Sequence, residues 1–175
     1  MYNETIKSIL ERRSIRRYED RQIKEEDLDL ILKAGTYAAS GRGAQAPIII
    51  SIQSPEVIRE LSKINASIFN RETDPFFGAP TVIMVLTDKS RNTGVEDASL
   101  VLGNMMLAAH SLGLGTCWVH RAKEELDFPF VQGMLKALGI DHTKYRGVGH
   151  ITLGYPAVTG LKAAPRKDNY IYKIK

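Results

Sequence analysis

Apolar positions recur along the chain at two spacings, and those spacings predict its helices and strands. A spacing of three and four residues, typical of helices with one buried face, starts after Asn3, a residue suited to capping a helix. The spacing recurs after the acidic run 24–27, which favours a helix start. Pro55 suits the first position of another helix. Helices are therefore predicted from Asn3 to the arginines near 12, from 24 to the loop at 40–43, from Ser54 to Ile64, from Val95 to Leu112 and from Phe130 to Leu138.

Apolar runs rich in β-branched residues predict strands between these helices. The strands are expected at 47–52, 81–88, 116–119 and 148–155, with the alternating tail 170–174 as a last strand. The helix at 95–112 is apolar on most sides, which predicts burial in the core or in a subunit interface. Because helices and strands alternate without a regular βαβ series, the order favours an α+β sandwich over a doubly wound sheet.

The length of 175 residues suits a single domain, which we expect to span residues 1–175. No stretch approaches the roughly 20 apolar residues that cross a bilayer, and the N-terminal sequence lacks the apolar core of a secretory signal. Cys117 is the only cysteine, which excludes an intramolecular disulfide and a cysteine-rich metal site. These features predict a cytoplasmic protein with no membrane partner.

The basic residues gather near the two ends of the chain. Lys and Arg number 24 against 20 Asp and Glu, a net charge of +4. Five arginines lie at positions 12, 13, 16, 17 and 21, and Arg166 and Lys167 form a second basic pair. Both clusters indicate an anionic partner. A solvated basic face is the alternative, and the charge pattern alone favours it.

The sequence lacks the motifs that many nucleotide-binding and hydrolytic enzymes use. It has no GxxxxGK[ST] phosphate loop, no GxGxxG after a strand and no HExxH. Its four histidines have no metal-ligand spacing, so no metal is expected, and no Ser, Cys or Thr occupies a nucleophile elbow. A cofactor that carries its own chemistry explains a chain with anion-binding clusters and no evident catalytic side chain.

Five segments resemble the nitroreductase family, in the order that the family has them. Residues 12–18 (RRSIRRY) are similar to its RRSxRxF/Y signature, and residues 39–47 (ASGRGAQAP) to its PSxxNxQPW loop. The FGAP segment at 77–80, the stretch NMMLAAHSLGLGTCW at 104–118, and GYP with PRK near the C-terminus complete the match. The resemblance implies a three-layer α/β/α sandwich with a mainly antiparallel mixed sheet, and an intertwined homodimer that binds FMN between its chains.

The resemblance also assigns roles in FMN binding. Arg12 and Arg166 are expected at the phosphate, with Lys167 near it, because planar guanidinium groups bind phosphate well. Arg16 is expected at the pyrimidine end of the flavin, where its charge would stabilise the anionic reduced ring and raise its reduction potential.

The remaining expected contacts come from three parts of the chain. Arg13 and Ser14 are assigned to the phosphate and ribityl groups. Ser40 and Gln45 are expected to reach the flavin from the partner subunit. Backbone groups of the segment 114–116 are expected at the edge of the flavin ring, where glycine permits a close approach; these residues are Leu114, Gly115 and Thr116.

Some positions depart from the family or match it loosely. Gly43 stands where the family usually has Asn, so one hydrogen-bond donor is missing, and Ile48 makes a less aromatic wall. Asn70 aligns loosely with a flavin contact. The chain is short for the family, which predicts an open or differently covered pocket. Cys117 lies in a strand-like run, which favours a buried, inert thiol over a redox-active one.

The resemblance implies an NAD(P)H:acceptor oxidoreductase. NADH or NADPH would pass hydride to the flavin and leave, and an electron-poor acceptor such as a nitroaromatic or a quinone would follow in a ping-pong sequence. No side chain is expected to be catalytic, because the cofactor carries the chemistry. A flavin-binding or flavin-transforming protein with little reductase activity is the alternative. Nucleic-acid binding by the arginine cluster is disfavoured, because only Tyr18 supplies an aromatic ring among the arginines.

Overall fold

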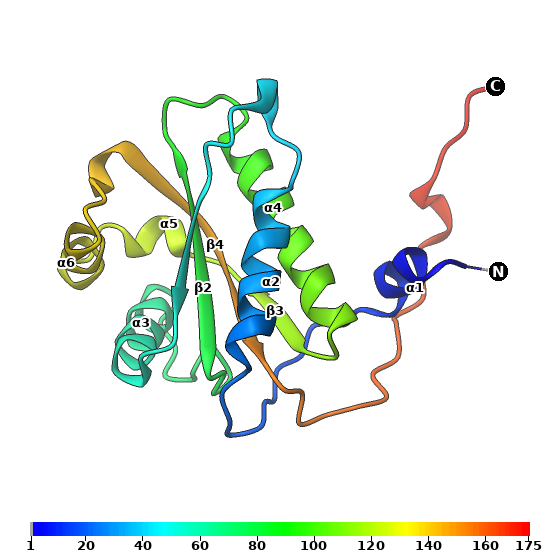
Figure 1. Ribbon diagram of the computed structural model, residues 1–175, viewed down its shortest axis with the longest axis horizontal. Coiled ribbons are helices and arrows are strands. Elements are labelled where there is room, and N and C mark those ends of the chain that lie inside the picture. The colour runs from blue at the N-terminus through cyan, green and yellow to red at the C-terminus, as the bar shows by residue number, and fades with distance from the viewer. Residues whose placement is uncertain (1) are drawn as a thin grey trace.

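The computed structural model describes residues 2–175 and has three layers, with one sheet between two layers of helices (Figure 1). Helices α2 (Glu25–Thr36) and α4 (Gly94–Ser111) cover one face of the sheet. Helices α3 (Pro55–Ile68), α5 (Ala122–Glu125) and α6 (Pro129–Ala137) cover the other. The expected α+β class and the α/β/α layering are therefore confirmed.

The sheet has four strands in the order β1-β2-β4-β3, and every neighbouring pair is antiparallel. The strands are β1 (Ile48–Ile52), β2 (Thr81–Asp88), β3 (Gly115–Val119) and β4 (Tyr145–Gly154). Strand β2 is apolar along most of its length because helices bury both of its faces. Ile83 and Val85 pack with α2 and α4, and Met84 and Leu86 pack on the other side. The expected mixed character is limited to one isolated parallel bridge, described below.

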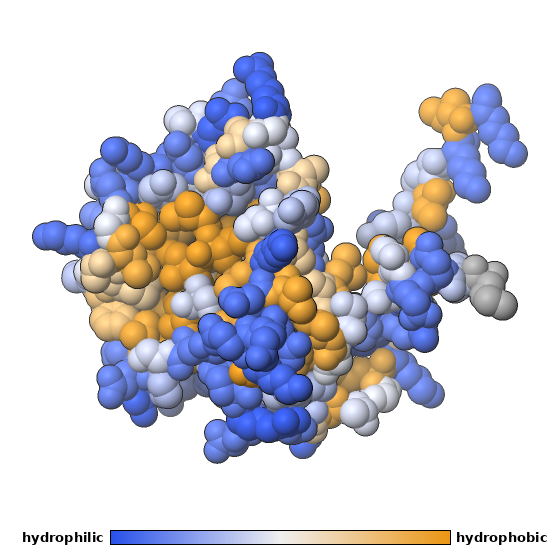
Figure 2. Space-filling model, viewed as in Figure 1, coloured by the Kyte–Doolittle hydropathy of each residue, from blue (hydrophilic) through white to orange (hydrophobic). Residues whose placement is uncertain are grey.

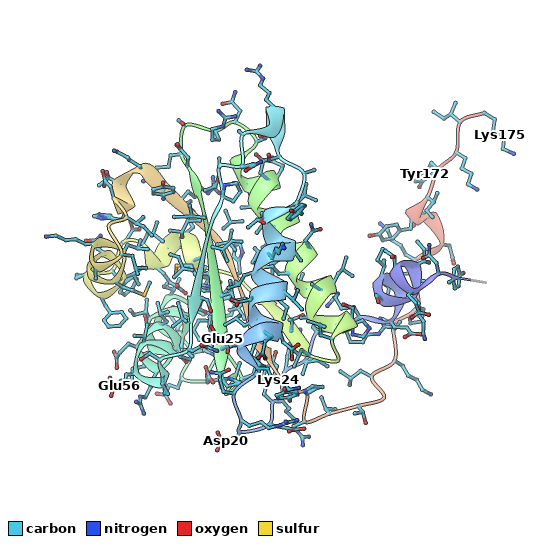
Figure 3. All side chains as sticks on the ribbon, viewed as in Figure 1. Asp20, Lys24, Glu25, Glu56, Tyr172 and Lys175 are labelled. Carbon is cyan, nitrogen blue, oxygen red and sulfur yellow. The ribbon has the colours of Figure 1, made fainter. Side chains whose placement is uncertain are left out.

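The predicted strand at 170–174 is wrong for the chain as described. This tail contains only the 3-10 turn η3 (Asp168–Tyr170), and no strand of the same chain pairs with it. Figure 3 shows Tyr172 and Lys175 on a tail that extends away from the body of the molecule. Tyr172 is 80% exposed and Ile174 fully exposed, so the alternating apolar residues have no partner within one chain.

The first helix rests on α4 but contributes no buried residue to the core. Helix α1 (Glu4–Glu11) begins as expected, because Asn3 Oδ1 accepts a hydrogen bond of 2.9 Å from the Ile6 amide. Its apolar residues are nevertheless exposed, and Leu10 is 50% accessible. Figure 2 shows apolar side chains along the arm that α1 and the tail form beside the body. Helix α5 was not predicted from the sequence, because four residues are too few to show a helical repeat.

A buried polar cluster joins three elements of the fold. His150 on β4 and Glu125 on α5 are both fully buried, with His150 Nε2 3.0 Å from Glu125 Oε2. Asn65 of α3 donates a hydrogen bond of 2.6 Å to Glu125 Oε1 and another of 2.8 Å to the His120 carbonyl. The cluster therefore fixes α3 and α5 against the sheet.

Replacement of Glu125 by alanine is expected to destabilise the protein strongly. The change leaves one buried Asn65 donor without its acceptor and removes packing beside His150, at a cost of about 2 kcal/mol in the free energy of unfolding. Urea unfolding followed by far-UV circular dichroism measures the change. Lys123→Ala, an exposed neighbour on the same short helix, is the matched control. Equal stability of the two variants would contradict the assignment.

Candidate functional site

The arginine segment 12–18 lies along the outer edge of the sheet, beside β3. Ser14 forms an isolated parallel bridge with Thr116, and the Ile15 amide donates a hydrogen bond of 2.9 Å to the Thr116 carbonyl. Gly115 is needed for this contact, because a Cβ there would lie 2.8 Å from Cγ1 of Ile15. The glycine at 115 therefore has an explanation within the chain itself, whereas its expected contact with flavin stays a prediction.

Tyr18 fixes the position of this segment. Its hydroxyl lies 2.7 Å from the Ile15 carbonyl, to which it donates, and 2.6 Å from Oγ1 of Thr152 on β4. Burial raises the pKa of Tyr18 well above its ordinary value, so the phenol remains protonated. The last residue of the RRSIRRY segment thus anchors the arginines to the sheet.

Tyr18→Phe is expected to lower the free energy of unfolding by about 1 kcal/mol, because the ring still fits while the Ile15 carbonyl loses its donor. Urea unfolding of the cofactor-free protein measures the loss. Tyr37→Phe removes a hydroxyl from a side chain that is 77% exposed, and it should change nothing. A neutral Tyr18→Phe would show that the hydroxyl is not an anchor.

Arg12 and Arg13 line a hollow of about 310 Å³ at the end of α4, which we call the arginine hollow. Two of its guanidinium atoms, Nη1 of Arg12 and Nε of Arg13, are buried and have no hydrogen-bond partner. Buried donors are nearly always paired, and a phosphate offers strong acceptors to guanidinium groups. The hollow therefore fits the phosphate group of an FMN cofactor. Of the other expected contacts, Leu114 and Thr116 also line it.

His110, in the last turn of α4, lines the arginine hollow as well. Burial lowers the pKa of His110, and the nearby Arg12 and Arg13 lower it further, while Glu11 acts in the opposite direction. The side chain is therefore neutral at pH 7 in the absence of an anion. No sequence pattern places His110 in this hollow, because the residue belongs to an apolar helix without a recognisable motif.

Arg16 lines a second hollow of about 450 Å³, which we call the aromatic cavity. Its guanidinium carbon lies 5.9 Å from the centre of the Phe77 ring. Cys117 also lines the cavity and is 3% exposed, in agreement with the expected buried thiol. Thr116 of β3 lines the arginine hollow, and the next residue, Cys117, lines the aromatic cavity. The two hollows thus flank the same sheet edge.

Three further residues of the aromatic cavity were missed in the sequence. Arg71 and Arg121 stack on the ring of Phe69, with guanidinium carbons 4.6 Å and 4.1 Å from its centre. Asn70 lies between two of them in a left-handed turn, with φ of 52°, that ends α3. A set of this kind has no sequence spacing that could reveal it, because two segments that are distant in sequence meet here.

Ser40 and Gln45 line a separate pocket of about 400 Å³ between α2 and β1. Their loop is tied to the first turns of α4: Asp97 Oδ1 accepts the Gly41 amide at 2.9 Å, and its Oδ2 accepts the Thr93 hydroxyl at 3.1 Å. The arginine hollow lies at the other end of α4, whose 18 residues span roughly 27 Å. One chain therefore does not bring these two groups together (Figure 1).

The second basic pair does not line the arginine hollow in the single chain. Arg166 donates to the carbonyl of Ala164, and Lys167 lies over the Tyr170 ring at 5.2 Å. The hollow is instead closed by tail residues 158–161. The convergence of Arg12 and Arg166 on one phosphate stays a prediction.

Residues 2–175 contain no group of three His, Cys, Asp or Glu side chains placed to hold a metal ion. Within the same range, no helix is both long and apolar enough to cross a membrane. The features of the candidate site are therefore the arginines of its two hollows, the aromatic rings beside them and the backbone of the sheet edge.

A three-layer α+β fold, with buried and unpartnered guanidinium nitrogens and an aromatic cavity along one sheet edge, is suited to binding a phosphorylated aromatic cofactor. Residues 9–155 match the Nitroreductase family, and the chain belongs to that family. This membership confirms the family resemblance, and the match spans the first four sequence segments and reaches into the GYP of the fifth, whereas PRK at 165–167 lies beyond it.

Individual relatives agree with this membership. An FMN reductase [NAD(P)H] of Bacillus subtilis is 33% identical over 197 aligned positions, covering 99% of this chain and 79% of the relative. The crystal structure of a nitroreductase with bound FMN from Bacteroides fragilis superposes with a TM-score of 0.90, at 28% identity, over 99% of this chain and 100% of that one. A second nitroreductase with bound FMN, from Desulfitobacterium hafniense, gives 0.86 at 26% identity over 99% and 100%.

Proposed function

We propose that this protein is an FMN-dependent oxidoreductase that passes electrons from NAD(P)H to an electron-poor acceptor such as a nitroaromatic or a quinone. Membership of the nitroreductase family supports this function, as do an FMN reductase among its relatives and bound FMN in similar structures. The observation that carries it is the pair of buried, unpartnered guanidinium atoms of Arg12 and Arg13. They supply donors for a phosphate at the place where the family signature lies.

Each part of the sheet edge has a distinct role in this proposal. Arg12 and Arg13 bind the phosphate, and Ser14 continues the contact along the ribityl chain. Arg16, on the side of the aromatic cavity, places a positive charge at the ring. Bound FMN would accept a hydride from NAD(P)H and deliver the electrons to the acceptor.

The other assigned residues complete the site. The backbone of Leu114 to Thr116 borders the ring, and Arg166 and Lys167 close over the phosphate from the tail. No side chain of the chain itself needs to act as an acid or base, because solvent can supply protons through an open pocket.

A homodimer completes the site, with Ser40 and Gln45 supplied by the partner. The span of α4 supports this arrangement, because it holds their loop away from the arginine hollow. The exposed apolar residues of α1 and of the tail need a covering surface. Figure 2 shows a broad apolar area over β1, whose outer edge is unpaired and able to accept a tail strand. Residues 1–175 form one domain in this assembly, and a reducing cytoplasm suits its single buried thiol.

Flavin uptake followed by steady-state kinetics tests the function. The purified protein is incubated with FMN, freed of excess and assayed for NADH and NADPH oxidation at several concentrations of 4-nitrobenzamide. Bound yellow flavin and parallel double-reciprocal lines are expected. A protein that takes up no FMN would overturn the proposal, and one that binds FMN without oxidising NAD(P)H would be a flavin-holding protein instead.

A further inference from the structure

His110 is a titratable side chain of the arginine hollow to which the proposed function assigns no role. It belongs to the last turn of α4 and lines the hollow together with Arg12 and Arg13. The side chain is half-buried, and none of the ion pairs among residues 2–175 includes it. Because an imidazole ring carries at least one N–H, His110 can donate to an acceptor that enters the hollow.

The end of α4 holds His110 in a fixed place. The Gly113 amide donates a hydrogen bond of 3.0 Å to the His110 carbonyl, and the Leu114 amide donates one of 2.8 Å to the Ala109 carbonyl. Gly113 has a φ of 77°, the left-handed conformation that commonly ends a helix. His110 therefore lies on a well-capped helix end, whereas the two arginines of the hollow come from the segment that follows α1.

The charged groups that face His110 all come from the end of α1 and the two residues after it. Arg12 and Arg13 disfavour protonation of the ring, while Glu11 favours it. The other segments around the hollow, including β3 and the tail, line it with uncharged residues only. Burial, and after it the charge of the arginines, lowers the pKa of His110. The ring is therefore neutral at pH 7 while the hollow holds no anion.

A phosphate in the hollow would change this balance. The phosphate of FMN carries close to two negative charges at pH 7, so it offsets the charges of Arg12 and Arg13 and offers acceptors to the ring. The C-terminal end of α4 carries a partial negative charge, which also favours a cation in its last turn. A protonated His110 is therefore stabilised both by the helix end and by the phosphate once the phosphate is bound.

We propose that His110 binds the phosphate of FMN alongside Arg12 and Arg13, and that its ring takes up a proton from solvent as the phosphate enters. The proposal rests on the proposed function and names how pH regulates that site. The protonated ring donates a charge-assisted hydrogen bond to a phosphate oxygen. The one covalent change is the new N–H bond of the imidazolium ring, and FMN itself is unaltered.

The affinity for FMN is expected to fall as the pH rises. The complex binds more protons than its separated components, because the pKa of His110 is higher with phosphate bound than without it. Affinity is lost as the pH rises through the pKa that His110 has in the complex. Below the lowered pKa of the free protein, both states are protonated and no further affinity is gained. Near pH 6 the phosphate gains its own second proton, so the effect is measured above that pH.

Titration of the cofactor-free protein with FMN between pH 6.5 and 8.5, followed by flavin fluorescence, tests the proposal. Wild-type affinity should fall about tenfold over this range, the effect of one charge-assisted contact. His110→Gln keeps an N–H donor but cannot titrate, so its affinity should match the wild type at pH 8.5 and change little with pH. His142→Gln, outside the hollow, should keep the wild-type profile. A flat wild-type profile, or a His110→Gln profile as steep as the wild type, overturns the proposal.

Riboflavin separates the phosphate from the rest of the cofactor. It has the ring and the ribityl chain of FMN but no phosphate, so its affinity should not depend on pH in the range where that of FMN does. A riboflavin affinity with the same pH dependence would place the titrating group away from the phosphate and overturn the assignment to His110.

NMR titration of the histidine rings observes the proton itself. The protein has four histidines, and the signal that is missing in His110→Gln identifies His110. Inorganic phosphate, and separately FMN, should move the titration midpoint of this signal to higher pH. A midpoint that neither ligand moves overturns the proposal.

These measurements need no turnover, so the proposal and the proposed function can fail separately. A pH-dependent FMN affinity that His110→Gln removes supports the proposal even if the loaded protein oxidises no NAD(P)H, an outcome that overturns only the oxidoreductase function. An FMN-loaded protein that oxidises NAD(P)H but binds FMN equally well at pH 6.5 and 8.5 keeps that function and overturns the role of His110.

Discussion

Arg12→Gln is expected to weaken FMN binding about 100-fold, which corresponds to about 3 kcal/mol for a charge-assisted contact to phosphate. The reason is the buried Nη1 atom of Arg12, which has no partner within the chain. Fluorescence titration of the cofactor-free protein with FMN measures the loss. Arg17→Gln is the matched control, because Arg17 belongs to the same segment but does not line the arginine hollow.

The stability of the cofactor-free protein separates a binding role from a structural one. An unpartnered buried donor costs free energy in the folded state, so Arg12→Gln should leave the free energy of unfolding unchanged or raise it. The substitution should also raise the pKa of His110 toward its ordinary value, because the positive charge of Arg12 is one cause that lowers it. An NMR titration of the His110 ring shows this directly. A destabilised variant with an unchanged His110 would contradict the role assigned to Arg12.

The order of elements could be read from the sequence because the sheet is buried on both faces. Strand β2 shows this most clearly: its apolar run predicts a central strand, and β1 and β4 flank it. The tail could not be placed by the same reasoning. The alternation of apolar and polar residues at 170–174 indicates that the segment can form a strand, but it does not indicate which strand would pair with it. No strand of the same chain pairs with this segment.

Some residues of the candidate site could be predicted from the sequence and others could not. The arginines at 12, 13 and 16 form a local motif, and the sheet edge places them on the two hollows as one continuous segment. Arg121 reaches the aromatic cavity only through a left-handed turn and a contact with Phe69, which is distant in sequence. Asp97 was missed because an acidic residue in the first turn of a helix is ordinary at that position, whereas here it holds the loop of Ser40.

The loop that carries Ser40 and Gln45 provides a test of the dimeric site. Asp97→Ala removes the acceptor of the Gly41 amide and of the Thr93 hydroxyl, so the loop that carries Ser40 and Gln45 should lose its fixed shape. The backbone there already has positive φ at Arg42 and Gln45, and it needs such contacts to persist. FMN affinity is expected to fall at least tenfold, since two hydrogen bonds to a carboxylate are lost. Ser99→Ala, on the same helix, is the control.

Mixing two defective variants distinguishes a shared site from a site within one chain. If each site takes Arg12 from one chain and the Asp97-supported loop from the other, a heterodimer of Arg12→Gln with Asp97→Ala has one intact site and one doubly altered site. Random exchange of subunits makes half of the dimers heterodimers, so about a quarter of all sites should bind FMN normally. Refolding the mixture from urea and titrating it with FMN measures that fraction. If the mixture binds FMN no better than its components, Arg12 and the Asp97-supported loop do not act together across two chains. That outcome would contradict the dimeric arrangement of the site.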